Sequence, residues 1–172
     1  VGRAGNPEDY FRRPVEEEIR RLRLRGEVIF AGRVPPERMP LYYANAEALA
    51  FPSLYEGFGL PPLEAMACGC PVVASEASAV PEVVGEAALL ADPRDPAALA
   101  GALGRVLSDG ELRRDLRRRG MARAALFTWE RAARETREVY AEVLEELSRR
   151  RRALRDLALP GEAAYTQERS LS

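Results

Sequence analysis

Two glutamates, Glu56 and Glu64, lie on either side of a glycine-containing segment in the run Glu56-Gly57-Phe58-Gly59-Leu60-Pro61-Pro62-Leu63-Glu64. A carboxylate accepts hydrogen bonds from paired hydroxyl groups such as those of a sugar. The two glycines permit unusual backbone angles and a close approach of a ligand. Backbone N–H groups at the start of a helix form a favourable site for phosphate. The run therefore predicts a diphosphate with one sugar on each side, which describes a nucleotide sugar.

This run follows a short apolar segment that is typical of a buried strand and precedes a predicted helix. Four such strands are expected, at residues 28–31, 48–51, 71–74 and 88–90. They alternate with helices expected at residues 14–25, 37–44, 61–68, 81–85, 96–107 and 111–126, and a long last helix begins after the N-cap Thr128. The alternation predicts an α/β fold, a three-layer, Rossmann-like parallel sheet with helices on both faces. Ligands bind at the carboxyl ends of such strands, which directs attention to residues 31–36, 52–64 and 74–81.

Composition restricts the chemistry that is available. The chain has 172 residues and a net charge of −1, which gives no indication of nucleic-acid binding. All 26 basic residues are arginine, so no imidazole can act as a base and no amine can form a Schiff base. The only cysteines, Cys68 and Cys70, have no histidine or second cysteine pair with which to form a zinc site. They are interpreted as small, reduced residues of a cytoplasmic protein, and no segment is long and apolar enough to span a membrane.

A wider set of segments resembles the C-terminal domain of group 1 (family 4) retaining glycosyltransferases, which have the GT-B fold. The resemblance covers about residues 1–147. Within it, two glutamates with seven residues between them form a specific central motif. The segments that carry the resemblance are residues 28–34, 41–46, 51–75, 81–85, 92–93 and 127–130.

The resemblance implies roles for individual residues. Glu56 would lie against the donor sugar as the catalytic residue, and Glu64 would hold the ribose hydroxyls. The long last helix would cross back toward an N-terminal domain. Neither a metal ion nor a cofactor is expected at the diphosphate, because such enzymes rely on the helix dipole and basic side chains. The remaining substrate contacts would come from Gly57, Phe58, Gly59 and Leu60 around the sugar and phosphates, and from Gly32, Arg33 and Val34 beside the base.

The resemblance also implies a domain organisation. Residues 1–155 are expected to form one nucleotide-sugar-binding domain that lacks its first strand and helix, and residues 156–172 to form a polar, disordered tail. An arginine and a lysine that clamp the diphosphate would lie upstream of Val1. A sugar or lipid-linked acceptor would bind a missing N-terminal domain. The chain is therefore expected to bind a nucleotide weakly and not to transfer sugar alone.

Several alternatives remain open. The chain could belong to another GT-B enzyme, such as an epimerase or a phosphorylase, or be a non-enzymatic nucleotide-sugar-binding module. A phosphorylase that uses pyridoxal phosphate needs a lysine, which this chain does not have. The two glutamates and Arg33 could be solvated surface residues, and Phe58 and Trp129 could be packing residues. The run Arg149–Arg152 is a solvated helix end or, alternatively, a peripheral contact with acidic lipid headgroups at the inner membrane face.

Overall fold

The computed structural model describes residues 7–157, and the chain divides into two compact units, Val1–Tyr42 and Tyr43–Ser172. The elements in chain order are α1 (Pro7–Arg21), the 3-10 turn η1 (Pro36–Arg38), α2 (Met39–Asn45), β1 (Leu49–Phe51), α3 (Leu60–Ala67), β2 (Val72–Ser75), α4 (Val80–Val84), the 3-10 turn η2 (Gly85–Ala87), β3 (Leu89–Ala91), α5 (Pro96–Ser108), α6 (Gly110–Ala124) and α7 (Trp129–Leu157).

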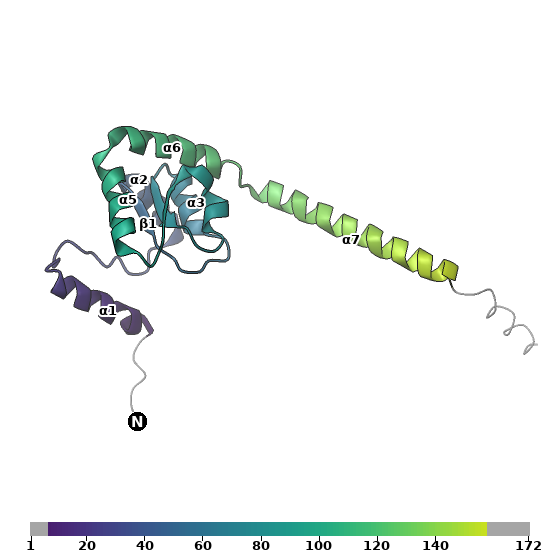
Figure 1. Cartoon of the computed structure of the whole chain (residues 1–172), viewed down its shortest axis with the longest axis horizontal. Coiled ribbons are helices and arrows are strands. Elements are labelled where there is room, and N and C mark those ends of the chain that lie inside the picture. The colour runs from purple at the N-terminus through teal and green to yellow at the C-terminus, as the bar shows by residue number, and fades with distance from the viewer. Residues whose placement is uncertain (1–6, 158–172) are drawn as a thin grey trace, which may run out of the picture. The chain divides into compact units, whose positions relative to one another are not determined.

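The second unit is built on a parallel sheet of three strands in the order β1-β2-β3. Leu49 pairs with Val72, and Val73 pairs with Leu89. All four residues of the central strand β2 are buried, as expected for a strand that is covered on both faces. In this unit the sheet is central, and helices lie on both of its faces (Figure 1). The predicted α/β fold with a parallel sheet is confirmed.

The core of this unit joins the sheet to α5 and α6. Val73 of β2, Val106 of α5 and Leu116 of α6 form a fully buried cluster. On α3, Met66 is fully buried as well, and Gly120 of α6 lies against it. A Cβ atom at position 120 would come within 3.2 Å of the Met66 Cγ atom, so the absence of a side chain allows α3 and α6 to pack closely. This contact fixes the helix that carries Glu64.

We expect Gly120→Val to lower the free energy of unfolding by about 1–3 kcal/mol, because the new side chain must displace Met66 from a close-packed interface. The matched control is Gly104→Val on α5, where an added Cβ atom meets nothing within 4 Å. Urea denaturation of both variants measures the difference. Equal unfolding midpoints for the two variants would show that the α3–α6 contact does not depend on Gly120.

The first helix differs from the prediction at both ends, since a helix was expected over residues 14–25 and α1 spans Pro7–Arg21. The helix ends early because Arg23 adopts a left-handed conformation with φ of 59°. The Leu24 N–H then donates a 2.9 Å hydrogen bond to the Ile19 carbonyl, which is the 6→1 bond of a Schellman motif. The backbone conformation of a non-glycine residue therefore terminates this helix, and residue type did not indicate it.

The expected strand at residues 28–31 is wrong. These residues have no regular secondary structure, and Ile29 is 86% exposed. A strand needs a neighbouring backbone to satisfy its N–H and C=O groups, and within the first unit no such partner strand is described. Phe30 instead lies under the Arg12 guanidinium of α1, with 4.5 Å between the Arg12 Cζ atom and the ring centroid. Phe30 of the apolar run therefore contacts α1, whereas Ile29 does not become buried.

The last helix, α7, begins as predicted, because the Thr128 hydroxyl accepts a 3.1 Å hydrogen bond from the Arg131 N–H and caps its first turn. The interpretation of Trp129 as a packing residue is wrong, since this side chain is 85% exposed. The helix continues to Leu157, into the expected tail of residues 156–172, and that tail lies outside the described residues from position 158. Five apolar residues at helical spacing form an exposed apolar stripe along this helix: Val139, Tyr140, Val143, Leu144 and Leu147.

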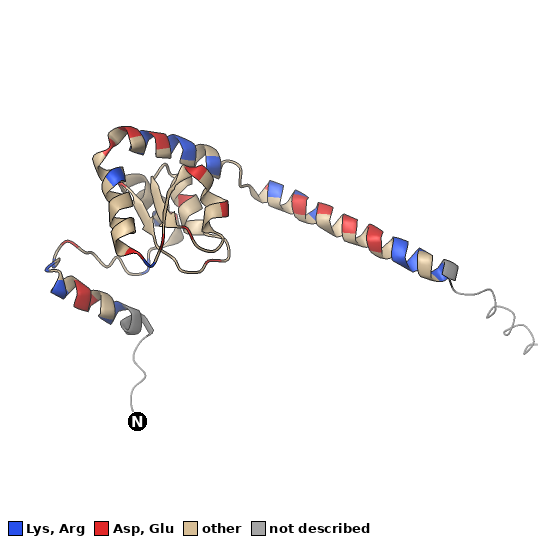
Figure 2. Cartoon of the chain, viewed as in Figure 1, with Lys and Arg blue, Asp and Glu red and all other residues tan. Residues whose placement is uncertain are grey.

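Charged side chains are concentrated on the outer helices. They line α6 and α7, whereas the residues of the three strands are uncharged (Figure 2). Among the helices of residues 7–157, none combines the length and the apolar character that crossing a bilayer requires.

Candidate functional site

The segment of residues 52–60, here called the glycine loop, connects the carboxyl end of β1 to the start of α3. Gly59 has a φ of 101° and is buried at the N-cap position of α3. A residue with a side chain adopts this angle only with strain, so Gly59 allows the chain to turn directly into the helix. The turn brings the loop to the carboxyl edge of the parallel sheet, where ligands bind in this class of fold.

The four backbone amides of residues 57–60 form a candidate anion site. Within the described part of the chain, none of them donates a hydrogen bond to another residue. The next two residues, Pro61 and Pro62, have no N–H group, so the amides just before them are the donors that this helix start can offer. Four free donors in sequence at a helix N-terminus suit a phosphate group.

Glu56 immediately precedes these four amides, and hydrogen bonds hold both its backbone and its side chain. Its backbone N–H donates to the Ser78 hydroxyl at 3.2 Å, and that hydroxyl donates to the Glu56 carbonyl oxygen at 2.7 Å. Its carboxylate accepts a 2.8 Å hydrogen bond from the Ser53 hydroxyl through Oε1. These bonds orient a half-buried carboxylate and leave its other oxygen, Oε2, available to a ligand.

Glu64 lies on the exposed face of α3, one turn into the helix. Its Oε2 atom accepts a hydrogen bond from the Tyr43 hydroxyl at 3.3 Å. Tyr43 comes from α2 and is buried, so the helix before β1 orients a side chain on the helix after it. The Oε1 atom of Glu64 has no such partner among the described residues, and the exposed carboxylate can accept hydrogen bonds from a ligand's hydroxyl groups.

Burial raises the pKa of Tyr43 to about 12, and the negative charge of Glu64 and the hydrogen bond to it act in the same direction. An unfolded tyrosine has a pKa of about 10. The contribution of the protonated Tyr43 to folding is therefore complete below pH 10 and is lost as the pH rises toward 12.

A spectrophotometric titration at 295 nm should detect an ionisation step near pH 12 that belongs to Tyr43. Tyr43→Phe is expected to abolish this step. Glu64→Gln is expected to move it to lower pH, although burial keeps it above the ordinary value. The neighbouring, exposed Tyr42 provides the matched control, because Tyr42→Phe should retain the step. A step near pH 12 that survives Tyr43→Phe would contradict the geometry.

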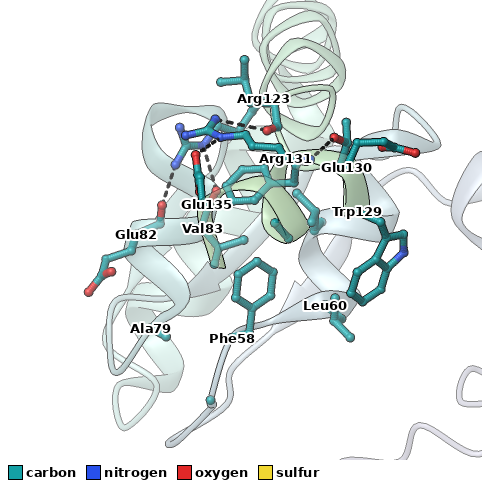
Figure 3. Close-up of a pocket in the computed structure, with 16 residues that line it drawn as sticks. Phe58, Leu60, Ala79, Glu82, Val83, Arg123, Trp129, Glu130, Arg131 and Glu135 are labelled. Carbon is teal, nitrogen blue, oxygen red and sulfur yellow. Dashed lines mark hydrogen bonds and ion pairs between the residues drawn. The ribbon is translucent and has the colours of Figure 1, made fainter. Parts of the chain in front are cut away.

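Phe58 does not belong to the core of the unit, but its ring contacts another aromatic side chain. Its ring points into a cavity of about 750 Å³ between the glycine loop, α4 and the start of α7 (Figure 3). There it meets the Phe127 ring edge to face, with centroids 5.9 Å apart and an angle of 80° between the ring planes. Leu60, which follows in the loop, is exposed.

The remaining predicted contacts, Gly32, Arg33 and Val34, belong to the first unit. Gly32 has a φ of 65°, and the Arg33 side chain is exposed. The position of these residues beside a base stays a prediction. Across residues 7–157, no three acidic or cysteine side chains are grouped so that they could hold a metal ion.

Both cysteines are free thiols. Cys70 is buried, and its sulfur lies 3.5 Å from the Pro71 carbonyl oxygen. Burial raises the pKa of the Cys70 thiol, which makes it less reactive. These facts agree with the interpretation of Cys70 as a small packing residue.

Comparison with known proteins identifies the family to which this loop and fold belong. Residues 4–123 match the family model described as glycosyl transferases group 1. The chain belongs to the group 1 glycosyltransferases. Its relatives include the O-antigen chain mannosyltransferase B of Escherichia coli, which is 45% identical over 115 residues that make up 67% of this chain and 30% of that protein.

Two solved structures show the same architecture as this glycosyltransferase chain. Sucrose-phosphate synthase from Thermosynechococcus elongatus matches with a TM-score of 0.73 and 34% identity, over 84% of this chain and 37% of that one. HepE from Anabaena, in complex with UDP-glucose, matches with a TM-score of 0.71 and 26% identity, over 80% of this chain and 38% of that one. The expected GT-B relationship is thereby confirmed. The chain spans about a third of the length of the curated relatives it matches.

The structure adds residues to which the sequence assigned no role. Tyr43 orients Glu64, while Ser53 and Ser78 orient Glu56. The topological rule for parallel sheets had pointed to residues 74–81, the segment that contains Ser78, but not to the residue itself. For Tyr43 the only available signal was its place on the helix before β1, and this does not predict a partner 21 residues away.

Proposed function

We propose that this chain is the donor-binding domain of a retaining glycosyltransferase. It binds a nucleoside diphosphate sugar, from which the enzyme transfers the sugar to an acceptor with retention of the anomeric configuration. The observation that carries the proposal is the row of four unpartnered amides at residues 57–60, with the fixed carboxylates Glu56 and Glu64 on the flanking segments. Membership of the group 1 glycosyltransferases supports it.

Each part of the ligand has a chemical counterpart in this site. The diphosphate accepts hydrogen bonds from the free amides, and the positive end of the α3 dipole favours its charge. Glu64 accepts hydrogen bonds from the two ribose hydroxyls, while Glu56 faces the donor sugar as the catalytic residue. Gly32, Arg33 and Val34 flank the base. The solved structure of HepE with UDP-glucose supports a nucleotide sugar as the ligand class.

We place the acceptor, a sugar or a lipid-linked sugar, on a second domain. The aligned part of this chain makes up only 30% and 33% of the two relatives it matches, which supports a larger enzyme. The exposed apolar stripe of α7, which includes Tyr140 and Leu147, supports the same proposal, because a face of this kind is usually covered by a neighbouring domain. The 172 residues therefore bind the donor but do not complete transfer.

The proposal includes no metal ion or cofactor at the diphosphate, since the helix dipole, the amides and basic side chains supply the positive potential. It places the enzyme in the cytoplasm, where Cys68 and Cys70 stay reduced. Peripheral contact with acidic lipids through Arg149–Arg152 belongs to the same proposal, since these four arginines lie in the C-terminal part of a helix that carries an apolar stripe.

Calorimetric titration of the chain with UDP, GDP and ADP tests the proposal. We expect one of the three to bind with a Kd between about 0.1 and 1 mM, which is weak because part of the site lies elsewhere. The matching nucleoside, which has no phosphates, is expected to bind at least about tenfold more weakly, since it cannot use the free amides. If none of the diphosphates binds, or if the nucleoside binds equally well, the donor-binding role is wrong.

A further inference from the structure

The Phe58 side chain is the one apolar anchor within the sequence Gly57-Phe58-Gly59. Neither neighbouring glycine offers a side chain that could hold the loop, and nothing would lie within 4 Å of a Cβ atom at Gly57. The edge-to-face contact with Phe127, at a centroid distance of 5.9 Å, therefore determines where this part of the loop lies. Phe127 is far from the loop in sequence and lies in the connection between α6 and α7.

Phe127 is itself held in place by backbone hydrogen bonds. Its N–H donates to the Ala124 carbonyl at 3.0 Å, and the Leu126 N–H donates to the Arg123 carbonyl at 3.1 Å. On the following side, Thr128 caps α7. The connection is thus a tight turn, and the Phe127 ring is presented from a fixed backbone.

Arg123, in the last turn of α6, links this ring to α4. Its guanidinium carbon lies 5.0 Å from the Phe127 ring centroid. Its Nε atom donates to the Val83 carbonyl at 2.9 Å, and its Nη2 atom donates to the Glu82 carbonyl at 2.6 Å (Figure 3). The last carbonyls of a helix have no partner within the helix, so this arginine satisfies them while covering the ring.

The glycine loop is thus held at two points, one just before α4 and one at the end of α4. Before α4, the Ser78 hydroxyl bonds to both backbone groups of Glu56. At the end of α4, Arg123 bonds to the Val83 carbonyl and lies over the Phe127 ring, and that ring contacts Phe58. The free amides lie between and just after these two points, so both contacts fix their direction.

We propose that Phe127 and Arg123 are positioning residues that keep the glycine loop in the conformation that presents its free amides to a diphosphate. The inference rests on the proposed function, because it assigns a role in donor binding to residues outside the loop. The apparent affinity of a ligand falls in proportion to the population of the competent conformation. Loosening Phe58 is therefore expected to weaken nucleotide binding without removing any group that touches the nucleotide.

The test compares Phe127→Leu, which keeps an apolar side chain but loses the ring, with the conservative Phe127→Tyr. Trp129→Ala is the matched aromatic control, because Trp129 is exposed and makes no ring contact in the described structure. The first measurement is the ¹⁵N order parameter of the Gly57 and Gly59 amides. The glycines Gly101 and Gly104 of α5 serve as internal references.

We expect Phe127→Leu to lower the order parameters of the loop glycines from about 0.85 to below about 0.6, the range of flexible backbone, while the α5 glycines do not change. Phe127→Tyr and Trp129→Ala should keep the loop rigid. Loop order parameters that stay at the wild-type value in Phe127→Leu would overturn the proposal. So would an equal fall in the α5 glycines, because it would show a general loss of structure instead of positioning.

The second measurement is the affinity for the nucleoside diphosphate that binds the wild-type chain. Phe127→Leu and Arg123→Met are expected to weaken it by about three- to tenfold, in line with a single aromatic or cation–π contact. Unchanged affinity in both variants would overturn the positioning role. If the wild-type chain binds none of the diphosphates, the proposed function fails, whereas the order parameters still decide whether Phe127 fixes the loop.

Discussion

Replacing Glu64 with alanine is expected to weaken the binding of a nucleoside diphosphate by about tenfold to a hundredfold. The variant removes a carboxylate that, in our proposal, accepts hydrogen bonds from both ribose hydroxyls, and at an exposed site we expect the pair to contribute about 1.5–3 kcal/mol in total. The exposed position of Glu64 on α3 means that its removal leaves no buried group unpaired except the Tyr43 hydroxyl. Calorimetric titration measures the change.

Two controls separate this effect from a change in folding. Tyr43→Phe removes the hydrogen bond to Glu64 but keeps the carboxylate, so a loss of only about two- to threefold is expected. Glu111→Ala removes an exposed carboxylate at the start of α6 and should not change the affinity. A Glu64→Ala chain that binds as tightly as the wild type would refute the ribose role.

Replacing Glu56 with alanine is expected to slow sugar transfer by the complete enzyme by about a hundredfold or more, the usual loss when a polar group at the reacting centre is removed. The affinity of the donor-binding domain for the nucleoside diphosphate alone should change by less than about threefold, since Glu56 is assigned to the sugar and not to the nucleotide. Steady-state kinetics of a protein that contains this chain and its acceptor-binding domain, together with titration of the chain, measure the two effects.

Ser53→Ala is the matched control for Glu56. It removes the 2.8 Å hydrogen bond to the Glu56 carboxylate but keeps the charge, so a smaller loss of rate, about two- to fivefold, is expected. A Glu56→Ala enzyme that keeps a transfer rate within about threefold of the wild type would contradict a role at the donor sugar.

The elements around the glycine loop could be predicted from the sequence because their signals are local. A short apolar run before Pro52 indicated β1, and two prolines after Gly59 indicated the start of α3. Thr128 indicated the start of α7 in the same way. In each case the residue type restricts the backbone conformation at its own position. The element can therefore be predicted without knowledge of any distant contact.

The incorrect predictions depended on contacts or conformations that residue type does not reveal. The run at residues 28–31 has the composition of a buried strand, yet a strand forms only where a partner strand is available. The end of α1 depends on the left-handed conformation of Arg23, which is uncommon for a residue other than glycine.

The side chains that orient Glu56 and Glu64 could not be predicted from the sequence, for a related reason. Ser78 bonds to Glu56 across 22 positions, and Tyr43 bonds to Glu64 across 21. The first pair depends on the pairing of β1 with β2, which places the loops after these two strands side by side. The second pair joins the helix before β1 to the helix after it. The type and spacing of the residues indicate what each loop could bind, but not which side chain of another loop supports it.

The most direct test of the central claim combines a change in the protein with a change in the ligand. The affinities of the wild-type chain and of Glu64→Ala are measured for the bound ribonucleoside diphosphate and for its 2′,3′-dideoxy analogue. If Glu64 holds the ribose hydroxyls, the wild-type chain prefers the ribonucleotide by about tenfold or more and Glu64→Ala binds both ligands alike. If Glu64→Ala keeps the full preference for the ribonucleotide, the two hydroxyls are recognised elsewhere and the account of this site is wrong.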